Sequence, residues 1–583
     1  MVYRNSFPRP PRETAASLLA VSVALVLAAC SGSDTPSVRA DDMTRASRSA
    51  VAQGGTLRWA VDAVPTTLNA FESDAGPATT LAAEALLPTL FTLDAKGRAT
   101  ADPDYLQSAE QSGGSSGSSG SSPQTVVYTL NPKATWSDGK ALGLADFVGQ
   151  WHALSGTDPA FAAAGAARTD GYDSIAQVVP GAKPNQVKVV FAHAYAPWRS
   201  LFTPLYPAAA TASPQAFTAG QKSTLTADAG PFTLKGAPGE DGQKTLTVAR
   251  NPHWWGDPAK LDTVVFTAVA PGDAAAALNS HKVDIADLSR AADDSGDTPD
   301  ATSGTQVLSA AAPGYLALAF NGGTGLLADP QVRRAVADAV DRQALADAVL
   351  KPLNLPAVPL GNHLLMSDQQ GYQDDAAALG ASAANAEKLL DAAGWRLGTH
   401  SDAASGSVIR ANGAKPLSLT LLTRAGSARD ATLTKLLTAQ LAKVGIGVTA
   451  KPVPEADFFT KHVAAGDFDL ALVSWPASRF PIADERALFA KPQVNADGSL
   501  TLGQNLSATG TDEIDKLLTE AVAATNPADA TRLTNEADIR IWQAAPSLPL
   551  FQSPELVGLR TNVRNAGAFG FATPRFQDIG FAK

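Results

Sequence analysis

The chain contains a single cysteine, Cys30, which restricts how a polypeptide of 583 residues can be stabilised. One cysteine forms no intrachain disulfide and cannot build a cysteine-rich zinc site. The fold must therefore rest on a hydrophobic core, and 45% hydrophobic with 17% charged residues is ample for one. By length alone we expect roughly two to four domains.

The position of Cys30 indicates where the chain is sent. Three arginines lie within residues 1–14, an apolar run follows over 15–27, and two alanines precede Cys30. This order is typical of a secretory signal. The small residues before the cysteine resemble the lipobox of bacterial lipoproteins, which implies cleavage of a signal peptide over 1–29 and a diacylglycerol thioether on the sulfur. The alternatives are a secreted protein with an incidental cysteine and an N-terminal membrane helix, although the run is short for a full span.

Charge and hydropathy argue against a nucleic-acid-binding protein and against a protein with membrane-spanning helices. The formal net charge is -10, and an acidic chain is a poor partner for nucleic acid, which binds by phosphate neutralisation. No later apolar stretch approaches ~20 residues, so we expect the lipid to be the only membrane attachment. The mature protein is expected to lie on the extracytoplasmic side of the membrane.

Low-complexity segments divide the chain. Residues 30–53 are small and polar and predict a flexible tether, with order beginning at Gly54. Residues 111–122, rich in Gly and Ser, predict a disordered surface loop. Because a strand-like run over 125–130 follows, this loop is expected within a hairpin and not at a domain boundary.

Strand and helix patterns alternate irregularly over the rest of the chain, which predicts a mixed α/β architecture. The clearest strands are expected at 186–191, 261–269, 315–320, 417–422 and 468–473. Helices are expected at 331–350, 383–393, 431–444, 512–524 and 528–543.

Catalytic signatures are weak. Residues 113–117 match a nucleophile elbow by composition alone, inside a Gly/Ser repeat. Residues 137–140 match the S-x-x-K pattern, but Asp138-Gly139 is a turn dipeptide and should break the helix that this chemistry needs. No P-loop, dinucleotide fingerprint or histidine metal pattern appears. We therefore expect a protein that is not an enzyme and has no cofactor and no metal.

The segment Thr125–Phe147 carries a family resemblance. Its strand, the turn Trp136-Ser137-Asp138-Gly139 and the helix start at Leu144 resemble the signature of the peptide/nickel class of bacterial extracellular solute-binding proteins, which serve ABC importers. Further stretches are similar to that family in the same order along the chain: 54–68, 229–232, 251–256, 261–262, 329–342, 386–395 and 548–550. Each is weak alone, but the resemblance extends from about Gly54 to the C-terminus.

This resemblance implies a two-lobed, periplasmic-binding-protein-like α/β fold of the peptide-binding type, with an extra small domain and a ligand cleft between the lobes. Lobe I would take 54–87, 207–312 and 545–583; the extra domain 88–206; and lobe II 313–544.

The resemblance also implies the cleft residues. In peptide binders of this family the ligand backbone pairs with one segment from each lobe, which tolerates any side chain. Trp475 matches the family's Gly/Ser-Trp element; it could wall a side-chain pocket or be a core residue at a strand end. The expected ligand-binding positions are Ala63, Val64, Pro65, Thr66, Thr67, Leu68, Val473, Ser474, Trp475, Pro476, Ala477, Ser478, Arg479 and Asp484.

One departure from the family concerns the ligand's amine. Peptide-binding relatives usually carry an Asp three residues after the Trp, where it pairs with the α-ammonium. Here that position is Ser478, followed by Arg479, which would attract a carboxylate or phosphate. Asp484 is a possible substitute or a solvated loop carboxylate.

Three functions therefore stay open. The first is a monomeric lipoprotein that captures peptides for the permease of an ABC importer. The second is a receptor for a non-peptide solute such as a glycoconjugate, haem or a metal chelate. The third is an envelope regulatory lipoprotein without transport.

Overall fold

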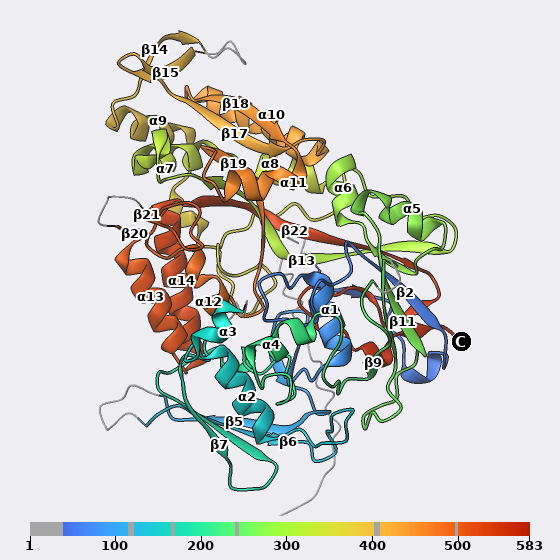
Figure 1. The fold of residues 1–583 in the computed structure, drawn as a ribbon. Coiled ribbons are helices and arrows are strands. Elements are labelled where there is room, and N and C mark those ends of the chain that lie inside the picture. Colours follow the sequence, from blue (N-terminus) through green and yellow to red (C-terminus); the bar gives the residue numbers. More distant parts are fainter. Residues whose placement is uncertain (1–38, 115–121, 165–169, 240–243, 402–407, 496–499) are drawn as a thin grey trace, which may run out of the picture. The chain divides into compact units, whose positions relative to one another are not determined.

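A ten-stranded mixed sheet is the central element of the computed structural model, which describes residues 39–114, 122–164, 170–239, 244–401, 408–495 and 500–583 (Figure 1). Cys30 and the expected signal peptide lie outside the described residues, as does most of the Gly/Ser loop. The strand order is β18 (Gly447–Val453), β17 (Ser418–Arg424), β19 (Leu470–Pro476), β13 (Thr305–Phe320), β22 (Ser547–Arg560), β12 (Ile285–Asp287), β2 (Thr56–Val61), β11 (Thr263–Ala268), β10 (Thr245–Arg250) and β9 (Phe232–Leu234).

Strands β13 and β22 are the longest strands of this sheet, and as neighbours near its middle they join its two halves. Their antiparallel register shifts between Ala311 and Tyr315, a β-bulge that bends the paired strands. One hydrophobic core lies mainly on the β2, β10 and β11 side and a second on the β17 to β19 side. Two cores on one continuous sheet make the α/β fold two-lobed. The bulge and the end of helix α14 fall at the expected boundaries 312/313 and 544/545, which stay a prediction.

A smaller antiparallel sheet lies within the expected extra domain. Its order is β5 (Leu106–Ser112), β6 (Thr125–Leu130), β8 (Gln186–Phe191) and β7 (Ile175–Pro180). Helix α2 (Leu144–Leu154) lies over this sheet (Figure 1). Strands β5 and β6 form the predicted hairpin around the Gly/Ser segment, although 111–112 belong to the strand itself.

The expected helices at 383–393, 431–444, 512–524 and 528–543 are confirmed as α9, α10, α13 and α14, whereas a fifth expected helix is wrong. The expected helix over 331–350 is two helices, α7 (Pro330–Ala339) and α8 (Arg342–Leu350). Asp341 causes the break, because its side chain accepts a hydrogen bond from the backbone of Ala344 and so starts a new helix. The remaining helices are α1 (Pro77–Leu86), α3 (Pro159–Ala163), α4 (Pro214–Phe217), α5 (Ala274–Asn279), α6 (Ser289–Ser295), α9 (Ala383–Ala392), α10 (Ala428–Lys443), α11 (Glu455–Asp457), α12 (Pro481–Asp484), α13 (Asp512–Ala523) and α14 (Pro527–Ala544).

Several short strands complete the described structure. They are β1 (Asp42–Met43), β3 (Phe91–Leu93), β4 (Ala99–Ala101), β14 (Arg396–Ser401), β15 (Val408–Asn412), β16 (Lys415–Pro416), β20 (Gln493–Val494), β21 (Leu500–Thr501), β23 (Val563–Arg564), β24 (Gly567–Ala568) and β25 (Gly580–Phe581).

The expected tether is wrong for residues 39–53. Strand β1 pairs with β24, and Val51 is fully buried where it bridges to Ala582. Composition missed this segment because its partners come from the far end of the chain, and such long-range pairing leaves no periodic pattern in so short a stretch.

The turn that carries the family resemblance is a structural landmark. Trp136 is buried and donates from its indole N–H to Asp146 at 3.1 Å. Asp146 also accepts from the backbone of Gly143, at the start of α2, at 2.9 Å, and from Ala208 at 2.8 Å. Gly139 takes a positive φ of 84°, so Asp138-Gly139 is a turn, as expected, and the S-x-x-K match is not on a helix.

Candidate functional site

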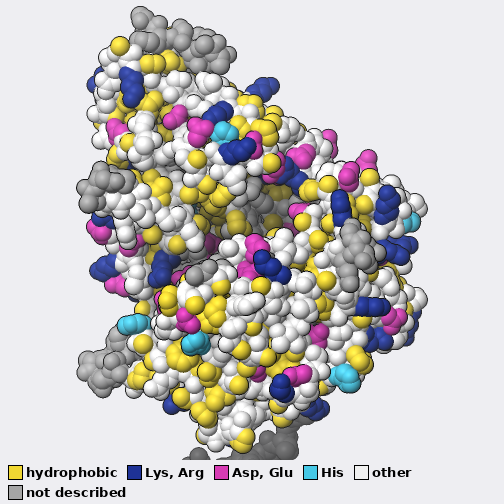
Figure 2. Space-filling view, viewed as in Figure 1, with side chains coloured by type: hydrophobic (Ala, Val, Ile, Leu, Met, Phe, Trp, Pro, Cys, Tyr) yellow, Lys and Arg dark blue, Asp and Glu magenta, His cyan; other side chains and the backbone are white. Residues whose placement is uncertain are grey.

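A cavity of about 660 Å³ lies between the end of β19 and the walls formed by α1 and the extra domain. Its size is within the usual range for small-molecule sites. On the viewed surface a hollow opens in the region bordered by α14, β22 and α1 (Figure 2). From lobe II the lining residues are Phe459, Ser474, Trp475, Pro476, Ala477, Ser478, Arg479, Phe480, Asp484, Glu485, Leu488 and Gln504.

The end of β19 lies at this cavity with one strand edge that pairs with no neighbouring strand. Strand β13 pairs with β19 along its whole length, as far as Gly314 opposite Pro476. On the other side, β17 pairs with β19 only at Leu470 and Ala471. Within the described part of the chain, residues 472–476 therefore have no strand partner on that edge. An extended chain could pair there by main-chain hydrogen bonds.

The first expected segment, Ala63–Leu68, does not line the cavity, and neither does Val473. Thr67 and Leu68 are buried in lobe I, where the Leu68 carbonyl accepts from the Tyr206 hydroxyl at 2.7 Å. The chain reaches the cavity two residues later, at Ala70 and Phe71. Of the expected positions, the structure brings together Ser474 to Arg479 and Asp484.

Trp475 lies in the cavity wall and also packs on the neighbouring core. Its indole is half-buried and contacts two small hydrophobic clusters. Phe459, itself 46% exposed, meets it edge-on with ring centroids 6.4 Å apart. The wall and core interpretations of this residue therefore both apply, since one ring face can pack while the other stays open.

The short helix α12 folds back onto Ser478. The Ser478 hydroxyl donates to Asp484, and its backbone N–H donates to Glu485 at 2.8 Å. Glu485 is 3% exposed, and its second carboxylate oxygen has no hydrogen-bond partner. Burial raises the pKa of Glu485 well above its ordinary value. Two carboxyl groups thus lie beside the position where the expected Asp is missing.

Arg479 is neutralised by a neighbouring carboxylate. Its guanidinium contacts Glu84 of α1 at 2.9 Å, and the Glu84 side chain is only 8% exposed. This ion pair connects the 474–479 segment with lobe I. An incoming anion would have to compete with Glu84 for Arg479.

Sequence reasoning missed the wall contributed by the extra domain. Tyr172, Tyr195 and Arg199 line the cavity, together with Phe91 and Leu93 of β3. These residues are scattered over more than a hundred positions and follow no motif. Aromatic residues are also frequent in hydrophobic cores, so no local signal distinguished them.

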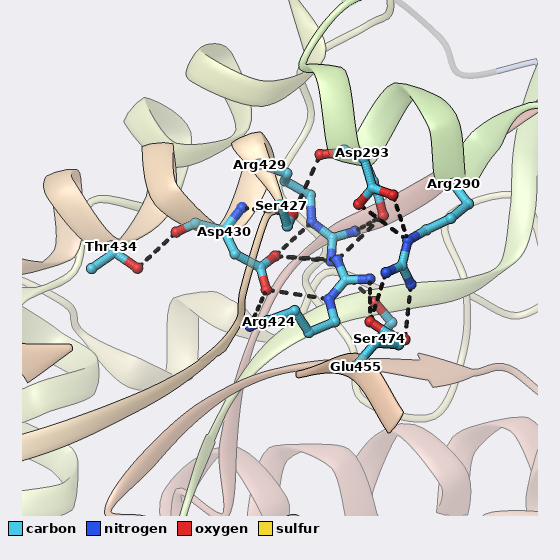
Figure 3. A network of polar contacts seen from close by, with 10 residues as sticks. Arg290, Asp293, Arg424, Ser427, Arg429, Asp430, Thr434, Glu455 and Ser474 are labelled. Carbon is cyan, nitrogen blue, oxygen red and sulfur yellow. Dashed lines mark hydrogen bonds and ion pairs between the residues drawn. The ribbon is translucent and has the colours of Figure 1, made fainter. Parts of the chain in front are cut away.

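A network of ion pairs lies behind the cavity wall, between α6 and the start of α10 (Figure 3). Arg429 contacts Asp293 and Asp430 and reaches the Ser474 hydroxyl at 3.5 Å. Arg290 of α6 makes a two-pronged contact with Glu455, at 2.9 and 2.6 Å. The network links the two halves of the sheet through side chains.

The described residues contain neither a metal-binding cluster nor a membrane-spanning helix. No group of three or more His, Cys, Asp or Glu side chains there is arranged to hold a metal ion. Within the same ranges every helix is too short or too polar to cross a bilayer.

Two α/β lobes on a shared sheet, with a cavity against the open end of β19, define the class of two-lobed solute-binding proteins. A family model described as bacterial extracellular solute-binding proteins, family 5 middle, matches residues 116–493, and the chain belongs to this family. Proteins of this family are binding components of ABC transporters and not enzymes, and this chain is such a component. Like them, it acts outside the cytoplasm.

Similar proteins include the oligopeptide-binding protein OppA of Mycobacterium tuberculosis (strain ATCC 25618 / H37Rv), 30% identical over 97% of this chain and 94% of that protein. The probable monoacyl phosphatidylinositol tetramannoside-binding protein LpqW of the same strain is 26% identical over 67% of this chain and 61% of that protein.

Solved structures share the fold. The periplasmic EDTA-binding protein EppA superposes with a TM-score of 0.77 at 21% identity, covering 91% of this chain and 97% of EppA. The oligopeptide-binding protein AppA of Bacillus subtilis, in complex with a nonapeptide, gives a TM-score of 0.65 at 18% identity, covering 91% and 100%.

Proposed function

We propose that the chain is the lipid-anchored solute-binding component of an ABC importer, and that it captures dipeptides or oligopeptides and delivers them to a permease. The similarity to OppA supports this over almost the whole chain. The observation that carries the proposal is the unpaired edge of β19 at the cavity. A peptide is the ligand class that an open strand edge binds without regard to side chain.

Side-chain contacts would add to this main-chain pairing. Trp475 and Phe459 offer aromatic surface to whichever ligand side chain lies next to them. An indole buried against a ligand contributes roughly 1.5–3 kcal/mol, which is about a tenfold to hundredfold change in affinity. The pair would favour apolar side chains at that position.

The ligand's amine would meet the two carboxyl groups beside Ser478. Asp484 stays accessible, while Glu485 has one carboxylate oxygen without a partner. An ammonium group placed there would pair with these carboxylates, which supply the negative charge that Ser478 lacks. The amine would then be recognised by α12 and not by the residue three positions after Trp475.

We expect the protein to bind its ligand without converting it chemically. A ligand held between lobe II on one side and α1 with the extra domain on the other stabilises the conformation in which both walls contact it. The folded protein is then stabilised by mass action, by about 2.7 kcal/mol at a free ligand concentration of a hundred times Kd. The melting temperature of the protein should therefore rise with ligand concentration.

The test begins with the full chain purified in detergent. Native mass spectrometry would identify solutes that co-purify, and calorimetry would then compare a free tetrapeptide, its N-acetylated form and a mannose glycan. The Trp475→Ala variant should bind the tetrapeptide at least tenfold more weakly. Trp255→Ala is the matched control, because that half-buried indole lies outside the cavity. Failure of the wild type to bind any peptide would refute the proposal.

A second candidate is a receptor for a non-peptide solute. Ser478 at the usual Asp position favours it, since a ligand without a free amine needs no carboxylate there. The names of LpqW and EppA point to a glycolipid and to EDTA as ligands of those proteins. Binding of the glycan or of a metal–EDTA complex, with no binding of peptides, would favour this candidate.

Anchoring and transport need separate tests. Cys30→Ser should release the protein from the membrane fraction, and the wild type should carry a lipid thioether detectable by mass spectrometry of the N-terminal peptide. We also expect a monomer that works with permease subunits. If deleting the gene leaves peptide uptake unchanged while envelope composition changes, the regulatory alternative holds instead.

A further inference from the structure

The charged side chains in the cavity wall differ in whether the protein itself neutralises them. Glu84 and Arg479 pair with each other, and Asp170 lies 3.7 Å from Arg486. At α12, the carboxyl groups of Asp484 and Glu485 accept hydrogen bonds from Ser478. All of these groups have a partner within the protein.

Arg199 differs from them. It lies in the cavity wall on a short 3-10 turn, Trp198–Ser200, and its side chain is exposed there. Within the described residues no ion pair and no hydrogen bond to its guanidinium is found, and no carboxylate is among the charges that act on it. Among the described residues that line the cavity, Arg199 is thus a cation whose charge the surrounding protein leaves unpaired.

The guanidinium is held in place by its neighbour. Its central carbon lies 4.3 Å over the ring of Trp198, a cation–π contact. Trp198 is 1% exposed, donates its indole N–H to Gln111 at 2.9 Å, and packs edge-on against Phe91. Because stacking uses the faces of the guanidinium, its N–H groups stay free for a ligand.

We propose that Arg199 binds an anionic group of the ligand, namely a carboxylate. This deepens the proposed function and rests on it. A carboxylate matches the fork of N–H groups and is bound by two parallel hydrogen bonds. In a peptide it comes either from the C-terminus or from an acidic side chain.

The consequence is a ligand with two recognised ends. The carboxyl groups near Ser478 belong to the lobe II segment 478–485, whereas Arg199 belongs to the extra domain. A zwitterionic peptide would contact both walls by charge and so connect them. A ligand that lacks the carboxylate would lose the contact with the extra domain.

The experiment uses the full chain in detergent and calorimetry with three probes: tetra-alanine with a free C-terminus, the same peptide as a C-terminal amide, and Ala-Ala-Glu-Ala amide. The wild type should bind the free acid roughly 10- to 100-fold more tightly than tetra-alanine amide. If only the C-terminal carboxylate reaches Arg199, the Glu-containing amide should bind as weakly as tetra-alanine amide; if an acidic side chain also reaches it, that amide should bind as tightly as the acid.

Variants isolate the contribution of Arg199. Arg199→Gln should abolish the preference for the acid, and Arg199→Lys should keep part of it, because lysine retains the charge and loses the fork. Arg532→Gln, an exposed position on α14 outside the cavity, is the matched control and should keep the full preference. Unchanged far-ultraviolet circular dichroism would show that each variant folds.

Two failures are distinguishable. If peptides bind the wild type with no preference for the carboxylate, or if the preference survives in Arg199→Gln, the assignment of Arg199 is overturned and the proposed function stands. If no peptide binds at all, the proposed function is overturned and this assignment with it.

Discussion

Removing the charge of Arg429 tests whether burial sets the strength of the network between α6 and α10. The Arg429 side chain is 4% exposed and contacts Asp293, 18% exposed, and Asp430, 1% exposed. Arg429→Met keeps the aliphatic part of the side chain and removes the cation that pairs with Asp293 and Asp430. Removing one partner of a buried ion pair costs about 3–5 kcal/mol. Arg424 still lies 3.3 Å from Asp430, so we expect the lower end, about 3 kcal/mol.

The matched control is Arg290→Met in the same network. The Arg290 side chain is 31% exposed and its partner Glu455 is 55% exposed, so solvent screens the pair and the loss should be below about 1 kcal/mol. Urea unfolding followed by circular dichroism measures both free energies of unfolding. Adding Asp293→Asn to Arg429→Met should recover part of the loss, because one uncompensated carboxylate disappears. A loss in Arg429→Met no larger than that in Arg290→Met would refute the reasoning from burial.

Three further predictions concern packing and pH. A Cβ at Gly230 would lie 2.3 Å from the carbonyl oxygen of Ala85, so Gly230→Ala should lower stability by about 1–3 kcal/mol, and an unchanged melting temperature would contradict this. Burial raises the pKa of Glu555 to about 8, so its proton is held more tightly in the folded state. That contribution to stability is complete below the unfolded pKa near 4.5 and is lost as the pH rises through 8. The free energy of unfolding of the wild type should therefore decline by at most about 4 kcal/mol between pH 5 and 9, and Glu555→Gln should lack this decline. Urea unfolding at each pH measures it. Because burial also raises the pKa of Glu485, an ammonium ligand should displace its proton, so affinity for free-amine peptides should rise with pH; calorimetry in buffers of different ionisation enthalpy should detect proton release that Glu485→Gln lacks.

Local patterns in the sequence were enough for most elements. Strands β6 and β8 begin and end where the alternation of apolar residues predicted, and helices α9 and α13 agree to within one residue. Period-2 and period-3.6 patterns report which side of an element is buried, and that is a local property. The break between α7 and α8 was missed because a polar cap at Asp341 prevailed over continuing periodicity.

The candidate site was only half accessible to this reasoning. Ser474 to Arg479 were found through the family resemblance, and they line the cavity. Arg199 and Glu485 were not found, because what sets them apart is the missing partner and not the residue type. Ala63–Leu68 were expected in the wall and are instead tied into lobe I, in part through the hydroxyl of Tyr206.

The sequence by itself determined the α/β class, the family, the strands and helices with the clearest patterns, and the loss of the usual Asp at position 478. Only the tertiary structure decided that α12 returns two carboxyl groups to that position, that Glu84 neutralises Arg479, and that Arg199 has no ion-pair partner among the described residues. The reason is physical: burial and charge pairing depend on residues far apart in the chain, and their distances are set only when the lobes and the extra domain pack together.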